Sequence, residues 1–276
     1  MTLNDIYHAI DPVALSLGPL QIRWYGLAYV AGFICAFLVI AKLSQRWKIR
    51  IDDDAFFTVV FCVILGGRLG YVLVYGDGYY LQHPEKILAF NEGGMSFHGG
   101  LVGVIIGGVI AAKITKIPFL TLADMGVVGV PIGLFFGRCA NFINGELWGA
   151  PTDMPWGVVF GGAAGTMPRH PSQLYEALLE GVVLFIILFA LSRKTPARPR
   201  GTFFGTFLLF YGLFRFAIEF IRQPDAQIGY LLGAHWFTMG QALSIPLMVA
   251  GVVFLIYAWK TKKPQMGLPN SEISQS

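Results

Sequence analysis

A short stretch of the sequence, FFGRCANFINGELWG, places a cation, two amides and a carboxylate among aromatic residues and glycines. Arg138, Asn141 and Asn144 follow one another at intervals of three residues, so a helix would present all three on one face. Glu146 comes two residues later. A guanidinium offers a planar fork of N–H donors that suits a phosphate. The stretch therefore indicates an anion-binding site, the alternative for the two asparagines being hydrogen bonds between helices.

A second group of the same kind occurs further along the chain. Tyr211, Arg215, Glu219 and Arg222 are spaced by four, four and three residues, which places them on one helical face. Glu219 is suited to orient Arg215. Two alternatives remain open: Arg215 and Glu219 form a purely structural ion pair, or Arg222 extends to lipid headgroups.

A histidine and a third arginine also stand in glycine-rich surroundings. His98 lies in GGMSFHGGL, where flanking glycines favour close approach of a ligand to the backbone, and a histidine there can accept a proton near neutral pH. The alternative is a histidine that only packs. Arg68 lies in GGRLGY and could instead pair with a carboxylate of a neighbouring helix. His98 and His170 lack the spacing of metal ligands, so we expect no metal.

The elements that must position these residues are apolar. Of the 276 residues, 55% are hydrophobic and only 13% are charged, about half the charged share of a typical soluble domain. The apolar residues form runs of about twenty residues, which predict transmembrane helices rather than barrel strands. We therefore predict an all-α integral membrane protein with seven transmembrane helices, at about 20–42, 54–75, 97–115, 119–143, 174–193, 201–222 and 238–260.

The positions of lysine and arginine predict the orientation of these helices. Thirteen of the 20 cationic residues fall in alternate loops and in the tail, which are cytoplasmic by the positive-inside rule. The N-terminus is then periplasmic and the C-terminus cytoplasmic. The net charge of +4 reflects this topology, so it indicates no nucleic-acid partner. Because no cationic segment or cleavage site precedes the first run, we expect that run to be retained rather than removed as a signal peptide.

The remaining segments are short, and we predict a single polytopic membrane domain spanning residues 1–276. Residues 1–19 are expected to lie along the membrane interface. Residues 76–96 and 144–173 are predicted outer loops, and residues 264–276 a disordered tail. The cysteines lie in apolar runs and are expected to pack as small hydrophobic residues without disulfides: Cys35, Cys62 and Cys139.

In this topology the polar residues share one depth. Arg68, Arg138 and Arg215 each lie in the second half of a run that travels from inside to outside, and His98 and Tyr25 open runs from the outside. Charge within a membrane is costly and usually functional. We therefore expect the site in the outer half of the bilayer.

These motifs resemble those of the bacterial prolipoprotein diacylglyceryl transferases. The family signature is Gly-Arg followed by Asn-Phe-x-Asn-x-Glu-x-x-Gly, which here covers Gly137 to Gly149. Cys139-Ala140 stands where the family commonly has Leu-Gly or Ile-Gly, and residues 150–168 are shorter than in some relatives. The other matching stretches are WYGLAYVAGF (24–33), GGRLGYVLVY (66–75), GGMSFHGGL (93–101), RHPSQLYE (169–176), YGLFRFAIEFIRQPDAQ (211–227) and GQALSIPL (240–247).

The resemblance implies an enzyme of the bacterial inner membrane, with its active site toward the periplasmic leaflet. Its reaction would move the diacylglyceryl group of phosphatidylglycerol to the thiol of the lipobox cysteine in a prolipoprotein. The product is a thioether, and glycerol phosphate is released. The partners are thus membrane lipid and a prolipoprotein signal peptide, and no cofactor is expected. This would be the first step of lipoprotein maturation.

The resemblance also implies roles for individual residues. His98 would take the proton of the thiol, with Tyr25 and Glu146 as helpers or competitors. Arg138 and Arg215 would stabilise the departing phosphate. The remaining candidates would bind substrate or hold the arginines: Asn141, Asn144, Glu146, Gly149, Arg68, Tyr211, Glu219 and Arg222.

Two other functions fit the sequence less well. An anion channel or transporter would use intramembrane arginines but would also need polar residues in the inner halves of the runs, which are nearly bare. An intramembrane protease would need a serine–histidine pair or two aspartates. Ser96 near His98 is the single candidate pair, and its spacing is poor for that purpose.

Overall fold

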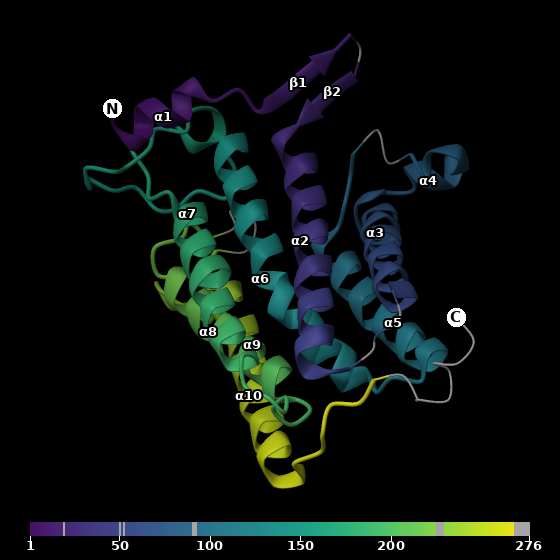
Figure 1. Ribbon diagram of the computed structural model, residues 1–276. Coiled ribbons are helices and arrows are strands. Elements are labelled where there is room, and N and C mark those ends of the chain that lie inside the picture. Colours follow the sequence, from purple (N-terminus) through teal and green to yellow (C-terminus); the bar gives the residue numbers. More distant parts are fainter. Residues whose placement is uncertain (19, 50, 52, 90–92, 225–228, 268–276) are drawn as a thin grey trace. The chain divides into compact units, whose positions relative to one another are not determined.

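Long apolar helices make up most of the chain in the computed structural model, which describes residues 1–18, 20–49, 51, 53–89, 93–224 and 229–267 (Figure 1). Six described helices are long and apolar enough to cross a membrane. Helices suit lipid because a helix satisfies most of its backbone polar groups internally. The six are α2 (Trp24–Trp47), α3 (Asp53–Tyr75), α5 (Phe97–Thr115, spanning from His98), α6 (Phe119–Asn144), the continuous segment Ser172–Ser192 and α10 (Met239–Thr261).

The predicted class, a helical membrane protein that crosses the bilayer several times, is confirmed at this level. The sixth predicted run, 201–222, forms α9 (Thr202–Ile218), which has 17 residues and counts as a shorter apolar helix. A span of the hydrocarbon core needs about 20 residues in an untilted helix. The number of crossings therefore stays a prediction.

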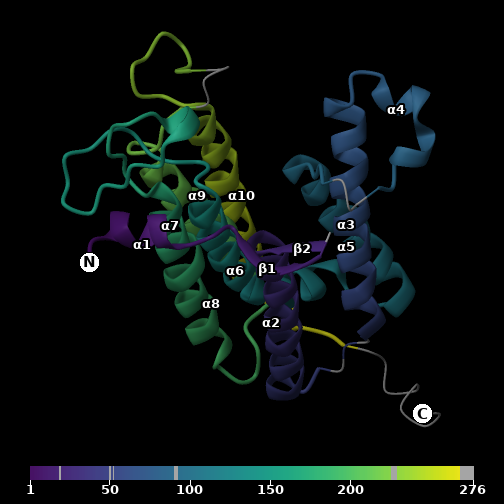
Figure 2. The ribbon, with the colours of Figure 1, turned by 90° about the horizontal axis from the view of Figure 1, so that it is seen from above.

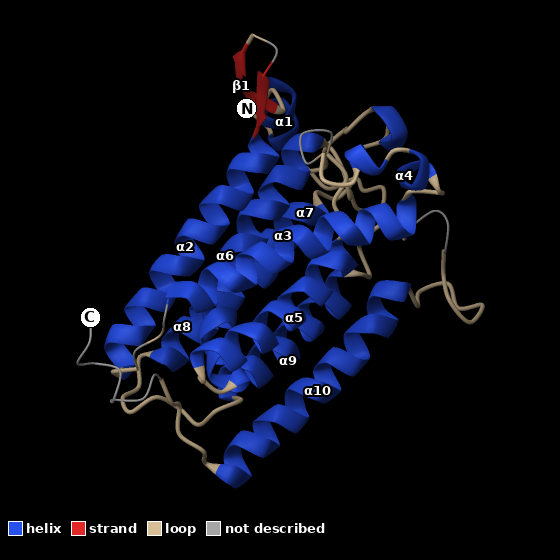
Figure 3. Cartoon of the chain, turned by 90° about the vertical axis from the view of Figure 1, so that its right-hand side faces the viewer, coloured by secondary structure: helices blue, strands red, loops and turns tan. Residues whose placement is uncertain are grey.

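The start of the first run was predicted too early, because residues before Trp24 form a hairpin. Strand β1 (Val13–Leu17) pairs antiparallel with β2 (Leu20–Arg23), and α2 follows directly (Figure 3). LQIR alternates apolar and polar residues, which is the pattern of a strand. A short helix, α1 (Leu3–Ala9), precedes the hairpin.

The fifth predicted helix is made of three consecutive parts. These are α7 (Ser172–Glu176), η4 (Ala177–Val183) and α8 (Leu184–Ser192). The middle part has π-helical hydrogen bonding, which is rare in proteins and often occurs at functional sites. Gly181 in this part packs directly on Phe135 of α6, where a methyl group would lie 2.7 Å from the Cβ atom.

The chain divides into two compact units, and α2 and α6 continue from one into the other. The first unit contains Met1–Leu43 and Asp124–Pro264. In it α9 packs against α8 and α10. Figures 1 and 3 show α6, α8, α9 and α10 running in roughly the same direction. The second unit contains Ser44–Ala123 and the described chain after Pro264. In it α3 and α5 lie side by side (Figure 2).

Small residues allow close contact of helix backbones in both units. In α9 and α10, a methyl group on Gly205 would lie 2.9 Å from the carbonyl oxygen of Gly251. In α3 and α5, Gly103 and Gly107 lie against the backbone of Cys62 and Val59. Glycine at these two positions therefore allows the two helix backbones to pack closely.

Asp124 joins α6 to the start of α9. Its Oδ2 accepts from the N–H of Gly201 at 2.7 Å, and its Oδ1 accepts from the N–H of Phe204 at 2.8 Å. These N–H groups have no partner within α9, so the carboxylate caps that helix. Asp124 is fully buried.

The segments between helices contain short structured pieces. Residues 76–96 include α4 (Tyr79–Gln82) and η1 (Pro84–Lys86), and residues 144–173 include η3 (Gly162–Ala164). Residues 90–92, and residues 268–276 of the tail predicted to be disordered, lie outside the described residues.

Helix α1 is fastened to the segment that follows α6. Tyr7 packs edge-on against Phe142 and Phe160, in a small apolar core that also contains Val158. Burial raises the pKa of the Tyr7 hydroxyl. Asn4 accepts a hydrogen bond from the N–H of Val159 at 2.9 Å. The N-terminal segment therefore supports the end of α6, which carries the signature residues.

Candidate active site

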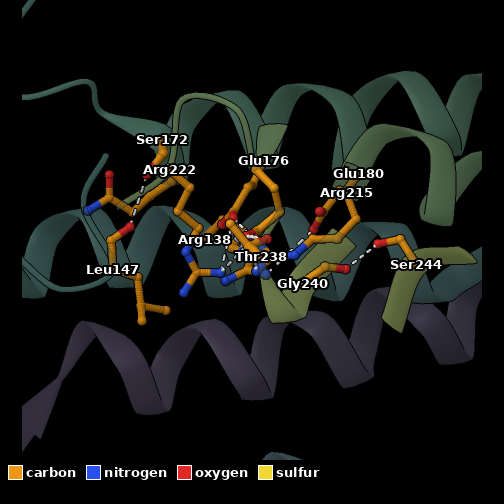
Figure 4. Close-up of polar contacts among 12 residues, drawn as sticks. Arg138, Leu147, Ser172, Glu176, Glu180, Arg215, Arg222, Thr238, Gly240 and Ser244 are labelled. Carbon is orange, nitrogen blue, oxygen red and sulfur yellow. Dashed lines mark hydrogen bonds and ion pairs between the residues drawn. The ribbon is translucent and has the colours of Figure 1, made fainter. Parts of the chain in front are cut away.

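Three arginines and three glutamates meet in the first unit (Figure 4). Each arginine contacts at least two of the carboxylates, so the six side chains form one network. The arginines come from α6, from α9 and from the turn after α9, and the glutamates come from α7, from η4 and from the end of α9: Arg138, Arg215, Arg222, Glu176, Glu180 and Glu219.

Glu176 is the centre of this network. Its Oε2 lies 2.9 Å from Nε of Arg138, and its Oε1 pairs with Nη1 of Arg215. Nη1 of Arg222 lies 3.7 Å from the same Oε1. A single buried carboxylate thus draws together arginines from three parts of the chain.

The other two glutamates also contact arginines of the network. Glu180 lies one helical turn after Glu176, with Oε2 3.5 Å from Nη2 of Arg138. Glu219 lies 2.6 Å from Nη2 of Arg215, so the ion pair allowed for in the sequence is present. It is also 3.6 Å from Arg222.

Glu219 is held in place from α10. Thr238 donates a hydrogen bond from Oγ1 to Oε2 of Glu219 at 2.6 Å. Gly240 lies so close that an added methyl group would overlap the Glu219 carboxylate, at 2.5 Å from Oε1. The start of α10 therefore fixes the carboxylate that orients Arg215.

Burial differs between the two signs of charge. The arginine side chains are 10–17% exposed, whereas the side chains of Glu176 and Glu180 are 0% exposed and that of Glu219 is 5%. The carboxylates are therefore more deeply buried than the arginine side chains. As three positive charges meet three negative ones, the network is formally neutral. Such an arrangement offers partly accessible N–H donors in fixed orientations, which suits binding of an oxyanion.

The signature residues after Arg138 form a tight turn. Asn141 and Asn144 both donate to Oε1 of Glu146, at 2.8 Å and 3.2 Å. Gly145 and Leu147 have φ of 67° and 60°, a region that a leucine rarely adopts. Strain of this kind often marks a functional site.

Gly149 lies where three chain segments touch. Its N–H donates to the carbonyl of His170 at 2.9 Å, and it forms a bridge with Arg222. A Cβ at this position would lie 2.7 Å from the carbonyl of Ile221 and from Cβ of His170. The position thus requires glycine for close packing beside the network.

Two predicted tyrosines also lie near the arginines. Tyr25, in the first turn of α2, shares a hydrogen bond of 3.2 Å with Tyr29 and lies near enough to Arg138 and Glu146 for electrostatic interaction. Tyr211 on α9 is in similar range of Arg138. The structure therefore gathers most predicted site residues into one unit.

His98 and Arg68 belong to the second unit. His98 is the second residue of α5, and its side chain is exposed. Arg68 is buried, and its guanidinium donates to backbone carbonyls of the segment that precedes α5. The predicted meeting of these two residues with the network remains a prediction.

Sequence reasoning missed the role of the carboxylates in the fifth run. Glu176 and Glu180 are not among the site residues expected from the sequence. Both are fully buried and stand four residues apart in a largely apolar run, so they share a helical face. A pair of charged residues in an otherwise apolar run was the available signal.

The sequence of this chain is similar to those of proteins in one known family. A family model described as "Prolipoprotein diacylglyceryl transferase" matches residues 12–257. Proteins named phosphatidylglycerol–prolipoprotein diacylglyceryl transferase are similar throughout. That of Geobacter sulfurreducens is 52% identical over 257 residues, covering 92% of this chain and 97% of the relative. Those of Oleidesulfovibrio alaskensis and Cupriavidus metallidurans are 51% and 50% identical over 93% and 92% of this chain, and over 96% of each relative. The chain belongs to the prolipoprotein diacylglyceryl transferase family.

Proposed function

We propose that this protein transfers the diacylglyceryl group of phosphatidylglycerol to the lipobox cysteine thiol of a prolipoprotein. A thioether forms and glycerol phosphate is released, the first step of lipoprotein maturation. The observation that carries the proposal is the convergence of three partly exposed arginines backed by buried carboxylates. The names of relatives about 50% identical over most of the chain support the same reaction.

In the proposed reaction, negative charge develops on the phosphate group that binds to these arginines. The substrate thiolate attacks the glyceryl carbon next to the phosphate, the C–S bond forms and the C–O bond breaks. The bonding electrons leave with the phosphate, which gains negative charge. Arg138 and Arg215 stabilise that charge, an effect worth about 3–4 kcal/mol for each well-placed donor.

The network must open partly for the phosphate to bind, because each guanidinium already faces carboxylates. A guanidinium has five N–H donors, so it can keep one carboxylate and still offer a pair of donors to the lipid. Glu176 and Glu219 thereby orient Arg215 and Arg138 during binding. Asn141 and Asn144 both donate to Glu146. In the proposed mechanism they hold Arg138 or bind the glycerol headgroup.

The thiol must lose its proton before attack, because the thiolate is the nucleophile. His98 takes this proton in the proposed mechanism, and Tyr25 and Glu146 are the competing candidates. An exposed imidazole at the first turn of α5 can exchange that proton with solvent afterwards.

The proposed topology extends the six candidate spans. Helix α9 crosses as a seventh span, with the N-terminus in the periplasm and the C-terminus in the cytoplasm. The chain then forms a single membrane domain of the bacterial inner membrane. The arginine network lies toward the periplasmic leaflet, where lipid headgroups and the lipobox cysteine meet.

The test is mass spectrometry of a lipobox peptide incubated with the purified protein and phosphatidylglycerol. We expect a mass gain of one diacylglyceryl unit, and its loss in Arg138→Ala and in His98→Ala. Arg193→Ala, at an exposed arginine that ends α8, serves as the control and should retain transfer. Full lipidation by the Arg138 variant would exclude the phosphate role, and full lipidation by the His98 variant would exclude the base.

A further inference from the structure

Arg68 is an arginine in an unusually enclosed position. It lies in the second half of α3, and it is 1% exposed. The rings of Tyr71 and Tyr80 lie 5.9 Å and 5.5 Å from the guanidinium carbon. A buried cation is tolerated only where its donors find acceptors.

The acceptors of Arg68 are backbone carbonyls from two places in the chain. Nη2 donates to Lys86 at 2.7 Å, and Nε donates to Ile87 at 2.8 Å. Nη1 donates to Gly93, and to Gly94 at 3.2 Å. All three nitrogens of the guanidinium are thus used to hold the two ends of one loop.

The loop continues directly into the helix that carries His98. The N–H of Ser96 donates to the carbonyl of Gly67 at 2.8 Å, next to Arg68 in α3. The Ser96 hydroxyl then caps α5 by accepting from the N–H of Gly99 at 3.2 Å. His98 lies within this capped first turn.

The first turn of α5 is also pressed against α3. A methyl group on Gly70 would lie 2.6 Å from the Cα atom of Gly99, and one on Gly66 would lie 2.5 Å from its carbonyl oxygen. The residue after His98 therefore touches the α3 backbone. The loop is held by Arg68 on one side and by this contact on the other, so the backbone at His98 is held against α3.

We propose that Arg68 is a positioning residue that fixes His98, rather than a ligand of the lipid phosphate. The proposal rests on the proposed role of His98 as the base. The guanidinium would fix His98 by donating hydrogen bonds to backbone carbonyls at both ends of the loop. A lysine at this position has one ammonium and cannot reach both sides.

The first experiment measures the protection of the loop from hydrogen exchange and does not depend on catalysis. Hydrogen exchange in the full-length protein in detergent is compared for wild type, Arg68→Met and Arg68→Lys. We expect faster exchange in residues 93–100 of both variants, with α10 unchanged. Unchanged exchange in residues 93–100 would overturn the proposal.

The second experiment separates positioning from lipid binding. A displacement of about 1 Å can cost about 100-fold in rate, so we expect kcat to fall by roughly that factor in both variants. KM for phosphatidylglycerol should stay within about threefold, because Arg68 does not touch the lipid. A raised KM with unchanged kcat would identify a lipid ligand and refute the positioning role.

Two controls make the outcomes distinguishable. Arg193→Met removes an exposed arginine and should leave exchange and kinetics unchanged. If Arg68→Met does not fold, Arg68→Lys carries the test, since it keeps the buried charge. If His98→Ala stays active, the base assignment fails and the positioning proposal falls with it. If His98→Ala is inactive while the Arg68 variants keep wild-type kcat, the positioning proposal alone fails.

Discussion

Replacing Glu176 with Gln removes the charge at the centre of the network while nearly keeping the side-chain shape. Glu176 is fully buried, lies 2.9 Å from Arg138 and 3.7 Å from Arg222, and also pairs with Arg215. Removal of one partner of a buried ion pair costs about 3–5 kcal/mol, because the remaining charge is left without compensation. Here three arginines share that loss.

The expected loss is near the lower end of this range. Arg138 keeps Glu180 at 3.5 Å and Arg215 keeps Glu219 at 2.6 Å, and the amide oxygen of Gln still accepts a hydrogen bond. We therefore expect Glu176→Gln to lower the free energy of unfolding by about 3 kcal/mol. Denaturant titration of the purified protein in detergent micelles measures this change.

Glu180→Gln is the matched control, because Glu180 is equally buried one turn further along. Its nearest arginine nitrogen is 3.5 Å away, and neither carboxylate oxygen has a hydrogen bond within the described part of the chain. Neutralising a buried charge without hydrogen bonds relieves a desolvation cost. We expect the stability of this variant to be unchanged or higher. Equal losses in the two variants would refute the central role of Glu176.

The same pair of variants tests anion binding. Glu176→Gln gives the network one net positive charge, so an anionic headgroup should stabilise it more than it stabilises the wild type. Unfolding is compared with added phosphatidylglycerol and with zwitterionic phosphatidylcholine. The same stabilisation by both lipids would show that the arginines do not face the headgroup.

Three further predictions concern single positions. Arg215→Lys should lower transfer at least about 100-fold, since a point charge does not replace a bidentate fork; near wild-type turnover in the peptide assay would count against it. Gly149→Ala should destabilise the protein by about 1–3 kcal/mol, because the methyl group would lie 2.7 Å from His170; an unchanged unfolding midpoint would contradict this packing. Asp124→Asn should cost about 1–2 kcal/mol in denaturant titration, through the cap of α9, and a neutral result would show that the cap contributes little.

The apolar runs predicted most helices well, because lipid requires long segments whose backbone groups are satisfied internally. Helices α3, α5, α6 and α10 begin and end within about one residue of the predicted runs. The errors occur where length and hydropathy are ambiguous. Residues 20–23 are apolar enough to extend a helix but pair with Val13–Leu17 instead, and α9 ends four residues before the predicted boundary.

Only part of the polar network could be predicted from the sequence. Residues on one helix can be placed on a common face from their spacing, as for Arg215 and Glu219. Contacts between helices depend on how each helix is rotated and shifted against its neighbour, which spacing alone does not contain. The contact of Arg138 with Glu176 is of this second kind, because the two residues lie in different runs. The acceptors of Arg68 were missed for a similar reason, since they are carbonyls and have no residue type to recognise.

A neutral network can bind an anion only if its negative groups cannot compete from the same side. The three glutamate side chains are 0–5% exposed and the three arginine side chains are 10–17% exposed, so an outside anion reaches the arginines more easily than it reaches the carboxylates. The carboxylates then prevent the three arginines from repelling one another before lipid arrives, and they hold the forks in fixed orientations. In the proposed mechanism, the arginines need not move as the C–O bond breaks and the bound phosphate gains charge. Because this stabilisation grows with the developing charge, it acts more strongly on the transition state than on bound phosphatidylglycerol, which is the condition for catalysis.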